Sequence, residues 1–146
     1  MTTASSATLL AIDPSALVGR YVPGPNRALV CAAMEQADTW CISDLARTEL
    51  LLALHRLAGD PYTAAGLAAT AHADLDAMVI VPVDQHCLAR AVAIGNTYGL
   101  RTVDAVHLAA IDRLPRPLRY ATLDGRQIPA ALALGLDVVA PVEQIN

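Results

Sequence analysis

The sequence contains no lysine, and all ten basic residues among its 146 are arginines. This excludes phosphate-binding loops with an essential lysine, Schiff-base chemistry and lysine general bases. Phenylalanine is also absent, and the aromatic residues are one tryptophan and four tyrosines. We therefore do not expect a protein that reads nucleic acid mainly by stacking bases on aromatic side chains.

Cysteine and histidine are few and scattered. Cys31, Cys41 and Cys87 form no CxxC pair, so a four-cysteine zinc site is excluded and the thiols are expected to be inert core residues. The four histidines form no HExxH motif, so we expect no histidine-based metal site.

Long hydrophobic runs are missing as well. The longest, ALVCAAM at 28–34, is far shorter than the roughly 20 residues that cross a bilayer. The first ten residues, MTTASSATLL, carry no Lys or Arg ahead of an apolar segment. We therefore expect no signal peptide, no membrane association and a cytoplasmic protein.

The composition indicates one globular domain spanning residues 1–146, with 55% hydrophobic and 16% charged residues. Short apolar runs alternate with longer helical stretches, which is typical of an α/β fold with a mainly parallel sheet covered on both faces. The strands are expected at Ala7–Asp13, Thr39–Ser43, Met78–Val83, Leu118–Leu123 and Asp137–Val142. The helices between them are expected at Arg27–Ala37, Asp44–Ala58, 61–76, 85–98 and Val103–Leu114, with caps at Asn26, Ser43, Asp60, Asp84 and Thr102, and a last helix ending at Gly135.

The net charge of −4 argues against a broad electrostatic grip on nucleic acid. The arginines are unevenly distributed, however, with five of them against three acids in residues 101–126. This region could present a local basic surface to a phosphate backbone, or it could form ordinary solvated helix faces and loops.

Two aspartates stand at the ends of predicted strands. Asp13 follows the first strand and Asp124 follows the fourth. Ligands of open parallel sheets bind beyond the carboxyl ends of the strands, so both acids are expected at that edge. The alternative for each is a cap on the next helix.

Two further acids lie within predicted helices. Glu49 has only apolar neighbours one turn away, and a carboxylate on such a face is costly to bury unless it is paired or binds a metal. Its alternative is an exposed position or a pair with Arg56. Asp104 lies in the first turn of its helix, where the helix dipole alone favours an acid.

Together these acids predict a cation site. Two carboxylates about 5 Å apart repel by about 3 kcal/mol at an effective dielectric of about 20. Four of them need a cation or partial protonation, and without lysine the cation must be arginine or a metal. Oxygen ligands suit Mg²⁺ or Mn²⁺, and such a site suits the cleavage of phosphate esters.

The sequence resembles the PIN domain family and, within it, the VapC-type toxins of bacterial toxin–antitoxin pairs. The matching segments, in order, are AIDPSALVGRYVPGP, ISDLARTELLLALHR, YGLRTVDAVHLAAI and YATLDGRQIPAALALGLDVV, and the third is the most specific. They span almost the whole chain. The resemblance implies a three-layer α/β/α sandwich with a central parallel sheet of about five strands in the order 3-2-1-4-5.

The resemblance also implies which residues form the site. The acidic set falls on Asp13, Glu49, Asp104 and Asp124, which would bind Mg²⁺ or Mn²⁺. Ser15 matches the hydroxyl of the D-x-S/T motif and Thr122 that of the T-x-D motif, and both would support the site. Two positions depart from the family pattern: Pro14 replaces the commoner Thr or Ser, and Gly125 replaces a larger residue.

The implied activity is that of a metal-dependent endoribonuclease in which water attacks the phosphodiester in line. Such toxins form homodimers and are silenced by an antitoxin protein that places a basic side chain near the acidic pocket. Arg101 and Arg126 are nearest in sequence to the acids and are the first candidates for RNA contacts, with surface ion pairs as the alternative.

Other functions remain open. Phosphoaspartyl hydrolases and receiver domains need a lysine that is absent here. A nuclease of RNA maturation or decay that is not a toxin, or a binding module with the same fold and no catalysis, would both carry this sequence pattern. Metal binding would separate the binding module from the nucleases.

Overall fold

The first strand shows how the sequence divides between the two faces of a sheet. In the computed structural model, which describes residues 8–145, Leu10 and Ile12 pack into one hydrophobic core and Ala11 into the other. This alternation follows from the period of two along a strand. The elements are β1 (Leu9–Ile12), α1 (Pro14–Tyr21), α2 (Arg27–Gln36), β2 (Thr39–Ser43), α3 (Asp44–Ala58), α4 (Pro61–Ala77), β3 (Val79–Val81), α5 (Gln85–Tyr98), α6 (Thr102–Ile111), β4 (Leu118–Ala121), the 3₁₀ helix η1 (Gly125–Gln127), α7 (Ile128–Ala133), β5 (Asp137–Val139) and α8 (Val142–Ile145).

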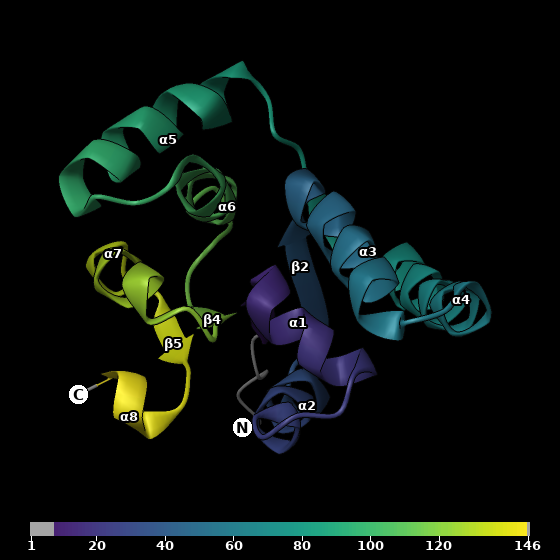
Figure 1. The fold of residues 1–146 in the computed structure, drawn as a ribbon. Helices are drawn as coiled ribbons and strands as arrows, with labels where there is room; N and C mark the ends of the chain where they lie inside the picture. Colours follow the sequence, from purple (N-terminus) through teal and green to yellow (C-terminus); the bar gives the residue numbers. More distant parts are fainter. Residues whose placement is uncertain (1–7, 146) are drawn as a thin grey trace, which may run out of the picture.

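The five strands form one parallel sheet in the order β3-β2-β1-β4-β5, which confirms the expected topology. Helices α1 to α4 cover one face, and α5, α6 and α7 cover the other (Figure 1). Because all strands run the same way, their carboxyl ends share one edge. No helix within residues 8–145 has the length and hydropathy needed to span a bilayer.

Four strands are shorter than the sequence suggests. β1 ends at Ile12 because Asp13 caps α1, and Ala7 lies outside the described residues. β3 covers only Val79–Val81, since the proline that follows has no backbone N–H for the ladder. β4 ends at Ala121, and β5 ends at Val139, before a proline and the short helix α8 in place of the expected strand end at Val142.

The expected helix caps are confirmed at three positions, where Ser43, Asp60 and Asp84 each accept a bond from a first-turn backbone N–H. Asn26 also stands at the expected N-cap position of α2, but its side chain makes no cap bond. One expected cap is wrong, because Thr102 is the first residue of α6 rather than its cap. Arg101 occupies that cap position with extended backbone, which turns its side chain back toward the first turn of α6.

Candidate active site

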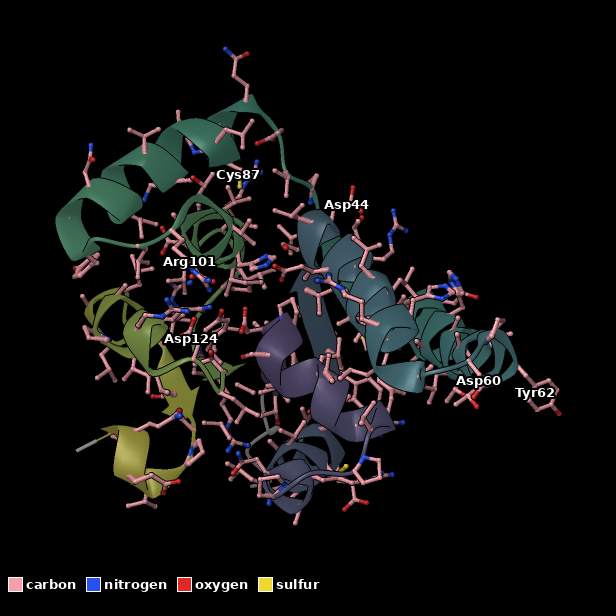
Figure 2. All side chains as sticks on the ribbon, viewed as in Figure 1. Asp44, Asp60, Tyr62, Cys87, Arg101 and Asp124 are labelled. Atoms are coloured by element: carbon pink, nitrogen blue, oxygen red, sulfur yellow. The ribbon has the colours of Figure 1, made fainter. Side chains whose placement is uncertain are left out.

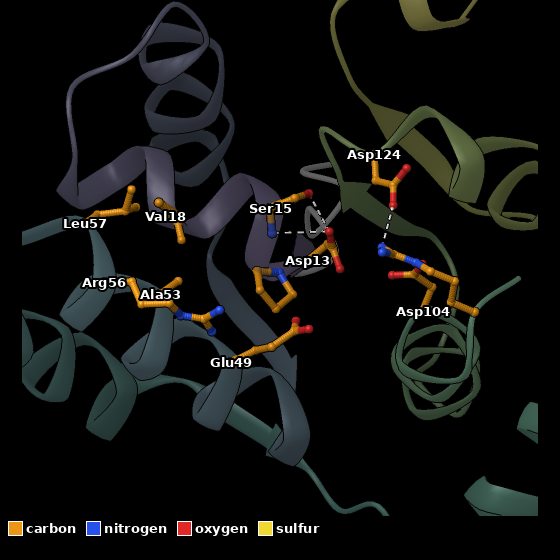
Figure 3. A pocket seen from close by; sticks show the side chains of 11 residues that line it. Asp13, Ser15, Val18, Glu49, Ala53, Arg56, Leu57, Asp104 and Asp124 are labelled. Atoms are coloured by element: carbon orange, nitrogen blue, oxygen red, sulfur yellow. Dashed lines mark hydrogen bonds and ion pairs between the residues drawn. The ribbon is translucent and has the colours of Figure 1, made fainter.

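All four acids singled out from the sequence line one cavity of about 400 Å³ at the carboxyl edge of the sheet (Figure 3). Asp13 comes from the end of β1, Asp124 from the end of β4, Glu49 from α3 and Asp104 from the first turn of α6. The lining residues are Asp13, Pro14, Ser15, Val18, Glu49, Ala53, Arg56, Leu57, Arg101, Asp104 and Asp124. Four carboxylates therefore meet two guanidinium groups in this lining.

Asp13 is the most enclosed of these acids, with 4% of its surface exposed. One oxygen, Oδ2, accepts bonds from the Ser15 backbone N–H at 3.2 Å, the Ser15 hydroxyl and the Thr122 hydroxyl at 3.3 Å. Burial raises the pKa of Asp13 above its ordinary value, although the bonds from Ser15 oppose the shift. Both predicted supporting residues thus contact the first acid directly.

Ser15 and Thr122 also connect α1 to the segment after β4. The Ser15 Oγ accepts from the Leu123 backbone N–H at 3.0 Å, and the Thr122 Oγ1 accepts from the Asp124 backbone N–H at 3.1 Å. These bonds hold the first and fourth acids in a fixed relation, which explains why hydroxyl residues stand at both positions.

Asp13 and Asp104 are joined by a residue that the sequence analysis did not single out. The fully buried Gln127 donates from Nε2 to Asp13 Oδ1 at 3.2 Å and to Asp104 Oδ1 at 3.0 Å. Its own Oε1 accepts from the Tyr120 hydroxyl at 2.6 Å. The available signal was the position of Gln127, three residues after Asp124 and just before the apolar segment IPAALALGL.

Glu49 is held from the opposite helix. The His107 Nε2 lies 3.0 Å from Glu49 Oε2, and the His107 Nδ1 lies 2.8 Å from the Ser43 Oγ. Glu49 therefore pairs with His107 rather than with Arg56, and its side chain is 41% exposed. Spacing within α3 alone does not reveal this partner, because His107 lies on α6, three residues after Asp104 and on the same face of that helix.

Arg101 and Arg126 neutralise the open side of the cluster. Arg101 Nε lies 3.0 Å from Asp104 Oδ2, and its Nη2 lies 3.5 Å from Asp124 Oδ2. Arg126 donates from Nε to Asp124 Oδ1 at 3.1 Å and from Nη2 to Asp124 Oδ2 at 3.2 Å. Figure 2 shows Arg101 beside Asp124, between α6 and the segment that follows β4. Both arginines thus form ion pairs here, which was the alternative to an RNA contact.

Asp124 is correspondingly stabilised as a carboxylate. Burial favours its neutral form, but the hydrogen bonds and charge of Arg126, together with the charge of Arg101, outweigh this effect and lower the pKa of Asp124. Asp124 also caps η1 by accepting from the Arg126 backbone N–H at 3.1 Å. Asp124 therefore both caps a helix and lines the cavity.

The donor set fits a hard divalent cation, since every acid in the cavity offers carboxylate oxygens. Within residues 8–145, however, no three His, Cys, Asp or Glu side chains converge on a single point. Glu49 turns to His107, while Arg101 lies between Asp104 and Asp124.

Known proteins resemble this chain in sequence and in fold. The sequence model of the family described as the PIN domain matches residues 10–114. The chain is 36% identical to Ribonuclease VapC46 of Mycobacterium tuberculosis (strain ATCC 25618 / H37Rv), over 89% of this chain and 95% of that protein.

Two solved structures have similar folds. FitAcB from Neisseria gonorrhoeae superposes with a TM-score of 0.66 at 18% identity, covering 88% of this chain and 95% of that one. A toxin–antitoxin complex from Klebsiella pneumoniae superposes with a TM-score of 0.62 at 19% identity, covering 79% and 86%.

Proposed function

The chain belongs to the PIN domain family, and we propose that it is a Mg²⁺- or Mn²⁺-dependent endoribonuclease that acts as the toxin of a toxin–antitoxin pair. The observation that carries this proposal is the meeting of Asp13, Glu49, Asp104 and Asp124 around one cavity. The VapC46 relative is named as a ribonuclease, which supports the choice of RNA as substrate. The proposal takes residues 1–146 as one PIN domain.

In this proposal Asp13, Glu49 and Asp104 hold the divalent cation, and Asp124 completes the set. The bound cation would supply an activated water and stabilise charge on the leaving oxygen of the phosphodiester. Ser15 and Thr122 keep Asp13 oriented toward the cavity, and His107 keeps Glu49 in place. The chain itself thus contributes a set of positioned carboxylates.

Arg101 and Arg126 are proposed to contact the RNA backbone. Their side chains are 64% and 63% exposed at the rim of the acidic cavity, so they can exchange a carboxylate for a phosphate. Replacing either by glutamine should weaken RNA binding uniformly across sequences and reduce its salt dependence. An unchanged salt slope would leave both as structural ion pairs only.

The proposed partners are an antitoxin protein and a second copy of the chain. A basic antitoxin side chain would complement the four acids of the cavity. The exposed Leu88 and Val92 of α5 offer an apolar surface for a homodimer. Co-purification with the product of an adjacent small gene, and the solution mass of the purified chain, test these two partners separately.

Metal-dependent cleavage of total cellular RNA tests the proposed activity. Wild type should cleave with Mg²⁺ or Mn²⁺ and stop when a chelator is added, whereas Asp13→Asn should not cleave. Asp76→Asn is the matched control, because Asp76 is an exposed aspartate of α4 outside the cavity lining. Equal cleavage by wild type and Asp13→Asn would refute the site.

Three further outcomes separate the alternatives. Metal binding without cleavage would indicate a narrow RNA specificity or a co-purified antitoxin. Absence of metal binding by the wild type would favour a PIN-fold binding module without catalysis. Cleavage without growth arrest on expression would favour a nuclease of RNA maturation or decay over a toxin.

A further inference from the structure

Gln127 is an amide with no surface exposed, placed between two acids of the proposed metal site. Its Nε2 lies 3.2 Å from Asp13 Oδ1 and 3.0 Å from Asp104 Oδ1, so one nitrogen donates one hydrogen to each carboxylate. The two carboxylate oxygens therefore contact the same nitrogen. They belong to segments far apart in the chain, the end of β1 and the first turn of α6, and this amide links them directly.

The orientation of this amide is fixed by Tyr120. The Tyr120 hydroxyl donates to Gln127 Oε1 at 2.6 Å, which leaves the amide nitrogen to face the carboxylates. Burial, with the nearby charges of Asp13 and Asp104, raises the pKa of Tyr120 well above its ordinary value, so the hydroxyl keeps its proton. The reversed amide would place Oε1 against two carboxylates, which is electrostatically unfavourable.

An amide suits this place because it donates two hydrogens without carrying charge. An arginine there would cancel the negative charge that attracts a cation, and an acid would add repulsion between carboxylates. A neutral donor fixes the position of two ligands and leaves their charge available. In other proteins, residues that hydrogen-bond to the metal ligands and orient them in this way control the affinity for the metal.

We propose that Gln127, oriented by Tyr120, is a positioning residue that holds Asp13 and Asp104 together as paired ligands for a divalent cation. This proposal rests on the proposed function, since it assumes that the cavity binds Mg²⁺ or Mn²⁺. Tyr120 touches neither carboxylate by a hydrogen bond, so its effect on metal binding passes through Gln127. Tyr120 and Gln127 therefore act as one unit.

Calorimetric titration with Mn²⁺ tests the proposal on wild type, Gln127→Met, Tyr120→Phe and the double variant. Changes to residues that orient metal ligands cost about 10- to 100-fold in affinity, so Gln127→Met should raise the Kd by that factor. Tyr120→Phe should raise it in the same direction. In the Gln127→Met background, Tyr120→Phe should add no further change, since the two effects share one path.

Leu75→Ala is the control for a loss of stability without a change in the site, because Leu75 is a buried residue of α4 outside the cavity lining. Its thermal unfolding temperature should fall while its Kd for Mn²⁺ stays at the wild-type value. An unchanged Kd in Gln127→Met, or additive effects in the double variant, would overturn the role of Gln127. If wild type bound no Mn²⁺ at all, the proposed function itself would fail, which is a different result.

Discussion

Arg101 should limit how tightly the unliganded site binds a divalent cation. Its guanidinium pairs with Asp104 at 3.0 Å and with Asp124 at 3.5 Å. It therefore neutralises part of the negative charge that would attract a divalent cation. Arg101→Gln removes this competition and keeps a side chain of similar polarity. We expect the variant to bind Mn²⁺ more tightly than wild type, even though its RNA cleavage falls if Arg101 also contacts phosphate.

The size of this effect follows from Coulomb's law. A divalent charge about 5 Å from a guanidinium, in a water-like dielectric of about 80, is repelled by about 1.7 kcal/mol. The water-like value applies because the Arg101 side chain is 64% exposed. Since about 1.4 kcal/mol is a factor of ten, the Kd for the cation should fall by roughly 10- to 20-fold.

Mn²⁺ titration at low and high salt measures the effect. The fall in Kd should appear at low salt and shrink at high salt, because exposed charges are screened. Arg47→Gln is a matched control, since Arg47 also pairs with an aspartate three residues away, at 2.8 Å, outside the cavity lining. Equal Mn²⁺ affinity in Arg101→Gln and wild type at low salt would refute this reasoning.

Two further predictions concern other acids. Glu49→Gln keeps an oxygen for His107 but loses a charged ligand, so Mn²⁺ affinity in calorimetry should fall by at least about tenfold without loss of metal-free stability. Normal affinity would remove Glu49 from the site. Burial raises the pKa of Asp74, but bonds from Arg20 and Tyr21 outweigh it and lower the pKa below 3.8. Asp74 therefore stabilises the fold above about that pH, and this contribution is lost as pH falls through the lowered pKa. Acid titration of Asp74→Asn, monitored by circular dichroism, should show a smaller loss of stability on acidification, and an unchanged loss would contradict the ion pair.

The arrangement of the fold could be predicted because local signals and topology agree. Ser43, Asp60 and Asp84 mark helix starts directly, and the continuous apolar run LLAI marks a strand covered on both faces. Exact strand ends could not be predicted, since they depend on which backbone groups find a neighbour in the ladder. Val142 illustrates this limit, because it continues an apolar run and yet lies in α8.

The meeting of the four acids at one cavity could be predicted, whereas their hydrogen-bond partners could not. Asp13 and Asp124 follow strands, so their common edge follows from a parallel sheet. The bonds from His107 to Glu49 and from Gln127 to Asp13 join residues 58 and 114 positions apart. Such pairs depend on the packing of α6 and η1 against the sheet, which spacing along one helix does not reveal.

A crystal of the protein soaked in Mn²⁺ tests the central claim most directly. The account predicts an anomalous difference peak in direct contact with carboxylate oxygens of Asp13, Glu49 and Asp104, with Arg101 displaced from Asp104. A cation bound elsewhere, or no peak at a Mn²⁺ concentration that supports RNA cleavage, would contradict the claim that these carboxylates form one metal site.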